Sequence, residues 1–87
     1  MYNFMRLILF FDLPMVTNSD KKTYTSFRKY LIKNGYMMIQ FSVYCKIFNN
    51  RDAATNHINI LRKNIPSKGY IRLMLVTEKQ YNNSIIV

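Results

Sequence analysis

The sequence is poor in acidic residues and has one cysteine, two glycines, two prolines and no tryptophan. Four Asp and Glu, one His and one Cys cannot supply the ligand set of a structural zinc site or of a carboxylate-rich metal cluster. A single cysteine also excludes a disulfide framework, and Cys45 lies within an apolar run. Because small secreted domains usually need several disulfides, we expect a cytoplasmic protein.

Long hydrophobic runs are also missing. No apolar stretch approaches the roughly 20 residues that span a bilayer. The apolar run from Phe4 to Phe11 is too short, contains Arg6, and is not followed by a small-residue cleavage site. The sequence therefore predicts neither a membrane span nor a signal peptide, and we expect no membrane partner.

Basic residues are what the sequence has in excess. Its 87 residues include 13 Lys and Arg against four Asp and Glu, which gives a formal net charge of +9. The hydrophobic fraction of 49% is that of a folding chain and not of a disordered basic tail. We expect a single small domain over residues 1–87 that binds a polyanion, with nucleic acid as the leading candidate.

Apolar patterning and helix-capping residues divide the chain into strands and helices. Thr17 and Asp20 have the spacing of a capping box, and Asn49 with Asn50 can begin a second helix. The triplet Ile85-Ile86-Val87 is strand-like, so we expect residues 79–87 to form a C-terminal edge strand that pairs with another chain. The other predicted elements are strand 5–11, helix 18–33, a strand pair from a split of 36–48 near 40–42, helix 51–64 and strand 70–77.

This order predicts an α+β, ferredoxin-like split βαβ fold with both helices on one sheet face. Alternation along the strands assigns residues to the two faces. The helix-facing set is predicted to be Leu7, Leu9, Phe11, Phe41, Val43, Cys45, Ile47, Ile71, Leu73 and Leu75. The open face would be mixed, and we expect it to form a homodimer interface through Arg6, Ile8, Phe10, Tyr44, Arg72 and Met74.

Asp12 is the candidate catalytic and metal-binding residue. It ends the first predicted strand, where a carboxylate projects from a rigid element. Mg²⁺ is commonly held by one or two carboxylates with waters and substrate phosphates, so Asp12 from two protomers could share one ion and support phosphodiester hydrolysis. The alternative is that Asp12-Leu13-Pro14 is only the opening of a turn.

The first helix carries the candidate nucleic-acid-binding residues. Asp20 is the one acidic residue among its basic residues. This excess of positive charge favours sequence-independent contact with phosphates over a helix face that only meets solvent. These residues are Lys21, Lys22, Arg28, Lys29 and Lys33. His57 has no second His or Cys at ligand spacing and is expected to be structural. Lys68-Gly69-Tyr70 echoes the start of an RNA-recognition signature, but Ile71 and Arg72 depart from that pattern.

Three segments resemble the CRISPR-associated protein 2 family, most closely its type II-A members. They are Leu7 to Pro14, Gly35 to Tyr44 and Val76 to Gln80, and they occur in the family's order over nearly the whole chain. The resemblance implies a ferredoxin-like homodimer, packed through its open sheet faces, with a C-terminal strand that crosses to the neighbour. Members of this family usually continue past the position of Val87. We therefore expect that a segment contacting the family's partner, the integrase CRISPR-associated protein 1, is missing from this sequence.

The resemblance further implies a role in spacer acquisition. A dimer of this protein would bridge two dimers of the integrase, CRISPR-associated protein 1, and hold double-stranded DNA. We favour this DNA-binding scaffold. The first alternative is a Mg²⁺-dependent endonuclease, acting on RNA or DNA, in which Asp12 matches the family's metal-site aspartate. The second alternative is a monomeric basic RNA-binding module whose open face stacks bases.

Overall fold

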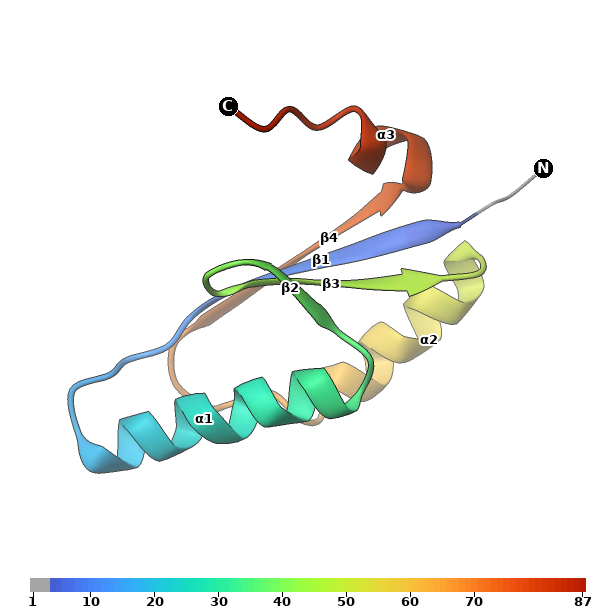
Figure 1. Cartoon of the computed structure of the whole chain (residues 1–87). Coiled ribbons are helices and arrows are strands. Elements are labelled where there is room, and N and C mark those ends of the chain that lie inside the picture. Colours follow the sequence, from blue (N-terminus) through green and yellow to red (C-terminus); the bar gives the residue numbers. More distant parts are fainter. Residues whose placement is uncertain (1–3) are drawn as a thin grey trace.

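The computed structural model describes residues 4–87, which form one four-stranded antiparallel sheet and three helices (Figure 1). The α+β class is confirmed, and the strand order β2-β3-β1-β4 is compatible with a ferredoxin-like fold. The elements are β1 (Met5–Asp12), α1 (Asn18–Lys33), β2 (Met37–Gln40), β3 (Val43–Phe48), α2 (Arg51–Leu61), β4 (Tyr70–Thr77) and α3 (Glu78–Asn82).

Side-chain caps fix where the two long helices begin. The Thr17 hydroxyl accepts from the Asp20 amide at 3.0 Å, and the Asp20 carboxylate accepts from the Thr17 amide at 3.1 Å. These backbone hydrogen bonds hold the pKa of Asp20 below its usual value. The Asn50 side chain accepts from the Ala53 amide at 2.8 Å. The predicted helix 18–33 and the predicted start of the second helix are thus confirmed.

The second helix is shorter than predicted. It ends at Leu61, and the expected extension to Asn64 is wrong. The amides of Lys63 and Asn64 bond carbonyls three residues back, so the last turn tightens instead of continuing the α-helix. Ile65 precedes Pro66, which disfavours helical backbone there.

The two long helices cover one face of the sheet and α3 lies on the other (Figure 1). Leu7, Leu9 and Phe11 of β1 face the helices and pack with Phe27 and Leu31 of α1. Ile71, Leu73 and Leu75 of β4 are paired with these β1 residues and share their face. The predicted faces of β1 and β4 are therefore confirmed, and the core lies between this sheet face and the helices.

The predicted faces of β3 are wrong. Tyr44 is paired with Leu9, is 1% exposed, and stacks on Phe11 with ring centroids 5.7 Å apart. It lies in the core and is not part of the open face. Val43, Cys45 and Ile47 instead share the open side of the sheet with Phe10, Ile8 and Arg6, their partners in β1.

A polar residue explains the wrong assignment. Lys46 lies on the helix side, and its ammonium group donates to the Asn34 carbonyl at 2.8 Å. Because a charged residue lies between Tyr44 and Phe48, the pattern favours Val43, Cys45 and Ile47 as the buried residues of this strand. The aliphatic stem of Lys46 nevertheless allows it to lie on the helix side of the sheet. The split of the long apolar run near 40–42 is confirmed, with Ser42 at a φ of 62° in the turn.

The predicted strand over residues 79–87 is also wrong for its first half. Glu78–Asn82 form α3, whose capping box pairs Thr77 with Gln80. Residues 83–87 are in no strand of this single chain, and Ile85, Ile86 and Val87 are at least 85% exposed. Their pairing with another chain stays a prediction.

Candidate active site

Asp12 is exposed at the end of β1, where the sheet meets two neighbouring turns. Its cross-strand partner is Tyr70, the first residue of β4. On the other side of β1, the Phe11 amide donates to the Ser42 carbonyl at 3.1 Å. A recess of about 430 Å³ opens here, and it is lined by Phe10, Phe11, Asp12, Ser42, Val43, Tyr70, Ile71 and Arg72.

A glycine allows β4 to begin so close to Asp12. Gly69 has a φ of +87°, a backbone conformation that residues with a Cβ atom rarely adopt. A Cβ at this position would lie 2.5 Å from the Asp12 carbonyl oxygen and 2.8 Å from a Leu13 side-chain carbon. Leu13 is buried and fixes the chain directly after Asp12. The backbone around the carboxylate is therefore tightly constrained, while the carboxylate itself is exposed.

Among residues 4–87, no group of three or more His, Cys, Asp and Glu side chains could hold a metal ion. The chain thus brings one carboxylate, that of Asp12, to this recess, and Ser42 and Tyr70 are hydroxyl-bearing residues that also line it. Oxygen donors of this kind suit Mg²⁺, which binds one or two carboxylates and keeps several waters. The donor set fits Mg²⁺ only if a second carboxylate or the substrate completes it.

The basic residues of α1 are all exposed. Lys21, Lys22, Arg28, Lys29 and Lys33 lie on the sides of the helix away from Phe27 and Leu31. Arg28 differs from the lysines, because its Nε donates to the Tyr44 hydroxyl at 3.1 Å. This basic face was predicted from the sequence, and the described chain leaves its lysines available to solvent.

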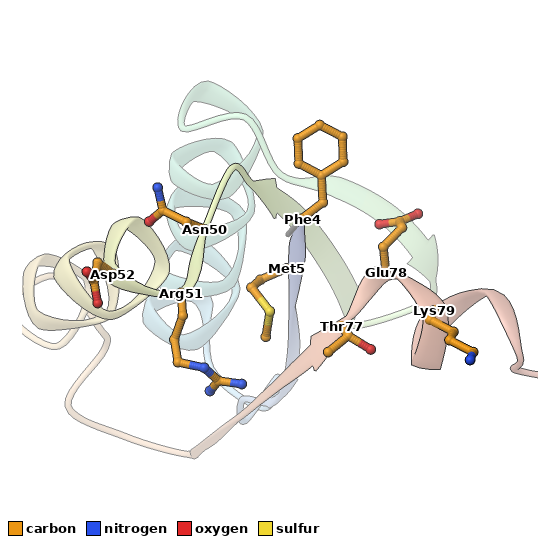
Figure 2. Close-up of a pocket in the computed structure, with 8 residues that line it drawn as sticks. All are labelled: Phe4, Met5, Asn50, Arg51, Asp52, Thr77, Glu78 and Lys79. Atoms are coloured by element: carbon orange, nitrogen blue, oxygen red, sulfur yellow. The ribbon is translucent and has the colours of Figure 1, made fainter. Parts of the chain in front are cut away.

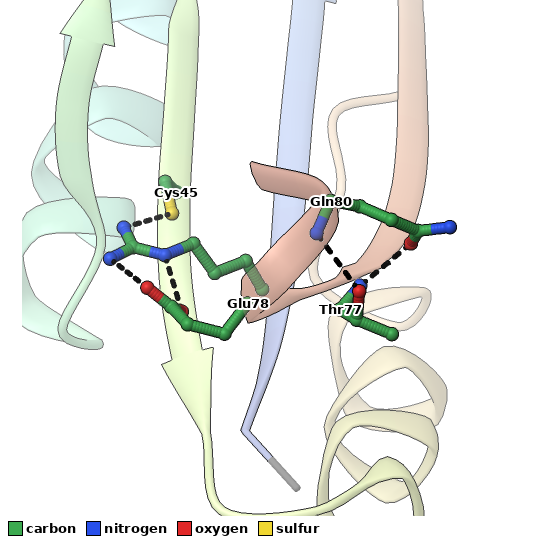
Figure 3. A network of polar contacts seen from close by, with 5 residues as sticks. Cys45, Thr77, Glu78 and Gln80 are labelled. Atoms are coloured by element: carbon green, nitrogen blue, oxygen red, sulfur yellow. Dashed lines mark hydrogen bonds and ion pairs between the residues drawn. The ribbon is translucent and has the colours of Figure 1, made fainter. Parts of the chain in front are cut away.

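Arg6, predicted to lie on the dimer face, is engaged within its own chain. Its guanidinium donates to both oxygens of Glu78 at 2.8 and 2.9 Å and lies 4.0 Å from the centre of the Tyr81 ring. It also contacts the Cys45 sulfur at 3.5 Å, and Figure 3 draws the polar contacts of Cys45 and Glu78 as dashed lines. The hydrogen bond from Arg6 lowers the pKa of Glu78. We refer to Arg6, Glu78 and Tyr81 as the α3 clamp, since they hold α3 against the open sheet face.

A second recess, of about 470 Å³, lies near the α3 clamp. Figure 2 shows Asp52 on the α2 side and Glu78 on the α3 side, with Met5 between them. The two carboxylates do not converge, and Glu78 is already paired with Arg6. This recess is therefore a poorer metal site than the one at Asp12.

His57 and Cys45 have structural surroundings, as predicted for both. The Tyr36 hydroxyl and His57 Nε2 are 2.8 Å apart, and the His57 ring lies 5.1 Å from that of Phe48. Burial, and then the charge of Lys46, lower the pKa of His57, while burial raises that of Tyr36. Cys45 is buried as expected, although on the opposite sheet face from the one predicted.

Arg72 and Tyr70 are the residues whose relation to Asp12 the sequence did not indicate. Arg72 was predicted on the open face, which is confirmed, and Tyr70 shares that face by alternation along β4, but only the β1–β4 register sets the two residues beside Asp12. Within residues 4–87, no helix is long and apolar enough to cross a membrane.

Comparisons with known proteins agree with this architecture. The sequence model of the family described as CRISPR associated protein Cas2 matches residues 5–84. The CRISPR-associated endoribonuclease Cas2 of Acidovorax ebreus is 52% identical over 77 residues, which cover 88% of this chain and 76% of the relative. The protein of the same name from Streptococcus mutans is 48% identical over 81 residues, covering 93% and 74% respectively. The chain therefore belongs to the CRISPR-associated Cas2 family, as the resemblance in its sequence implied.

Proposed function

We propose that this protein is a metal-dependent endoribonuclease of a CRISPR system, with Asp12 as its metal-binding residue. The observation that carries the proposal is an exposed carboxylate at a rigid strand end, inside a recess that also contains an arginine. The relatives are named endoribonucleases, which supports this activity over the DNA-binding scaffold that we favoured from the sequence.

Asp12 would hold Mg²⁺ through its carboxylate, and the ion would activate a water for phosphodiester hydrolysis. The chain's own contribution is to fix this carboxylate, because buried Leu13 and the tight approach of Gly69 limit its backbone movement. A rigid ligand keeps its geometry through the reaction, which is a general requirement of such sites.

A homodimer would complete the site by bringing the Asp12 residues of two protomers to one ion. The open sheet face supports this arrangement, since Phe10 and Met74 lie on it and Met74 is 48% exposed, whereas Ile8 beside them is already buried, with 7% exposure. The α3 clamp occupies the Arg6 end of the face, and the apolar area between it and Asp12 is left for the partner. Light scattering should then give about twice 10.5 kDa.

The test is cleavage of labelled single-stranded RNA and of duplex DNA in Mg²⁺ by wild type, Asp12→Asn and Asp52→Asn. Asp52 is the matched control, since it is an exposed carboxylate on α2 at the other end of the sheet. We expect Asp12→Asn alone to lose RNA cleavage. Equal activity in the two variants, or no wild-type cleavage with Mg²⁺ or Mn²⁺, would contradict the proposal.

The second candidate is the duplex-DNA scaffold of spacer acquisition, with the integrase CRISPR-associated protein 1 as partner. The exposed basic face of α1 favours it, because phosphate contacts by Lys and Arg bind a duplex without reading its sequence. Lys29→Glu with Lys33→Glu should weaken duplex binding and flatten its salt dependence, by about 0.9 in log–log slope per lost contact. Unchanged affinity would remove this face from the DNA-binding surface.

A further inference from the structure

Arg72 occupies an unusual position for one of the chain's many basic residues. It is exposed on β4, opposite Phe10 of β1, and it lines the same recess as Asp12. Asp12 and Tyr70 form the next pair along these two strands on the same sheet face. Arg72 is therefore a diagonal neighbour of Asp12, and diagonal Cα atoms in such a ladder are about 7–8 Å apart.

No carboxylate neutralises Arg72 in the part of the chain that the structure describes. The ion pair within residues 4–87 is that of Arg6 with Glu78, and Asp12 does not approach the Arg72 guanidinium closely enough to form another. The recess thus holds one negative and one positive side chain, at diagonal positions of the same sheet face, without an ion pair between them. An unpaired guanidinium presents a fork of donors that matches the oxygens of a phosphate.

Tyr70 also lines this recess. Its side chain is 82% exposed, although it is the cross-strand partner of Asp12 and lies at the first position of β4. An aromatic ring left exposed beside a cation offers a surface on which a nucleotide can pack while its phosphate meets the charge.

We propose that Arg72 is a positioning residue, which binds a non-bridging phosphate oxygen of the nucleic acid and so sets the backbone beside Asp12, with Tyr70 packing against the same nucleotide. The proposal rests on the Asp12 site of the proposed function, but it concerns binding and so can be tested without cleavage. Arg72 was expected in the dimer interface, and a phosphate-binding role gives it a different task on the same face.

The experiment compares wild type, Arg72→Gln, Arg72→Lys, Tyr70→Leu and Arg51→Gln. Arg51→Gln is the matched control, because it removes one exposed positive charge at the opposite end of β1. Affinity for a labelled 12-nucleotide RNA is measured by anisotropy in EDTA over a salt series, so that binding is read without hydrolysis. Cleavage in Mg²⁺ and solution mass are measured on the same preparations.

Arg72→Gln should weaken RNA binding about 10- to 100-fold, the usual effect of losing a hydrogen-bonded charge. Its log–log salt slope should fall by about 0.7, as for one lost phosphate contact on a single strand. Arg72→Lys should keep the slope and recover part of the affinity. Tyr70→Leu should weaken binding without changing the slope, and Arg51→Gln should resemble wild type.

The outcomes separate this inference from the endoribonuclease proposal. If wild type cleaves RNA and Arg72→Gln behaves like Arg51→Gln in affinity, slope and cleavage, the inference is wrong and the function stands. If wild type does not cleave but Arg72→Gln, unlike Arg51→Gln, binds RNA more weakly and with a smaller salt slope, the inference stands and the function is wrong. Loss of affinity with an unchanged slope, together with a change in mass for Arg72→Gln and Arg72→Lys, would show that Arg72 only maintains the fold or the dimer.

Discussion

Each end of β1 has one arginine and one carboxylate close to it, but only at one end do the two form an ion pair. At its start, Arg6 is bonded to both carboxylate oxygens of Glu78 and packs on Tyr81. At its end, Asp12 is exposed, and Arg72 lies in the same recess without an ion pair. The first pair attaches a helix to the sheet, whereas the second pair leaves both charges available to a ligand.

Under the proposed function, a chain with few acidic residues uses Glu78 for its structure and Asp12 for its activity. Glu78 is part of a tertiary contact, because a bidentate arginine–carboxylate pair is directional and fixes α3. Asp12 contributes no such contact among the described residues, and the backbone that carries it is still rigid. An exposed charge on a rigid backbone is typical of a functional residue.

The largest effect is expected at the glycine beside Asp12. Gly69→Ala places a Cβ at 2.5 Å from the Asp12 carbonyl oxygen in a backbone with φ +87°. We expect a loss of about 2–5 kcal/mol in the free energy of unfolding, measured by urea denaturation, from backbone strain and overpacking together. The start of β4 should also shift away from Asp12 and reduce RNA cleavage.

Gly35→Ala is the control for this substitution. Gly35 has the same φ of +87°, but the atom its Cβ would meet is the end of the flexible Lys46 side chain, at 2.7 Å. The cost should therefore be that of backbone strain, about 1–2 kcal/mol, with cleavage unchanged. Equal losses of stability in the two variants would show that Gly69 is not specifically needed at the Asp12 end.

The next largest effect is expected from substituting the charged residue at each end of β1, Arg6 at its start and Asp12 at its end. Arg6→Ala removes the paired hydrogen bonds to Glu78 and the contact with Tyr81, and should cost about 1–3 kcal/mol of stability while cleavage is retained. Asp12→Asn should change stability by less than about 0.5 kcal/mol. It should nevertheless lower cleavage on the order of 100-fold or more, since a metal ligand contributes several kcal/mol to the barrier.

Urea unfolding and initial cleavage rates on the same samples give both quantities. A stable Arg6→Ala protein without activity, or an unstable Asp12→Asn protein, would reverse the assignment of structure and function to the two ends.

The smallest effect is a pH dependence confined to the α3 clamp. The pKa of Glu78 is lowered by its hydrogen bond from Arg6, so its contribution to stability is full above the ordinary value of 4.5. That contribution is lost as the pH falls through the lowered pKa, because the unfolded chain then binds the proton more readily. Since the pair is partly exposed, the effect should stay below about 1 kcal/mol.

Glu78→Gln should remove this part of the acid dependence, and Asp12→Asn should leave it unchanged. Thermal unfolding at pH 3 to 6 measures it. An acid dependence that is the same in wild type and Glu78→Gln would mean that the clamp does not stabilise α3 in solution.

Much of the fold could be predicted from the sequence because local signals were strong. Thr17 with Asp20 indicated where α1 begins, and alternation assigned the faces of β1 and β4. The faces of β3 could not be predicted in this way, since Lys46 lies on the buried side and bonds a carbonyl at its rim. The helix at 78–82 was missed, although Thr77 and Gln80 have the spacing of a capping box, because the apolar triplet after it suggested a strand.

The candidate site was predicted only in part. Asp12 stood out as an acidic residue at a strand end, and the family resemblance pointed to the same position. Its neighbours could not be predicted, because Tyr70 and Arg72 are 58 and 60 residues further along the chain and only the register of β4 against β1 brings them there. Long-range register depends on the packing of the whole sheet, and a single sequence carries little information on it.

Manganese binding observed by NMR tests the central claim most directly. Mn²⁺ in place of Mg²⁺ broadens the amide signals of residues close to it. The account predicts that broadening is confined to the end of β1 and the start of β4, around Asp12 and Tyr70, and that Asp12→Asn abolishes it. Broadening centred on Asp52 or Glu78, or broadening that persists in Asp12→Asn, would contradict it.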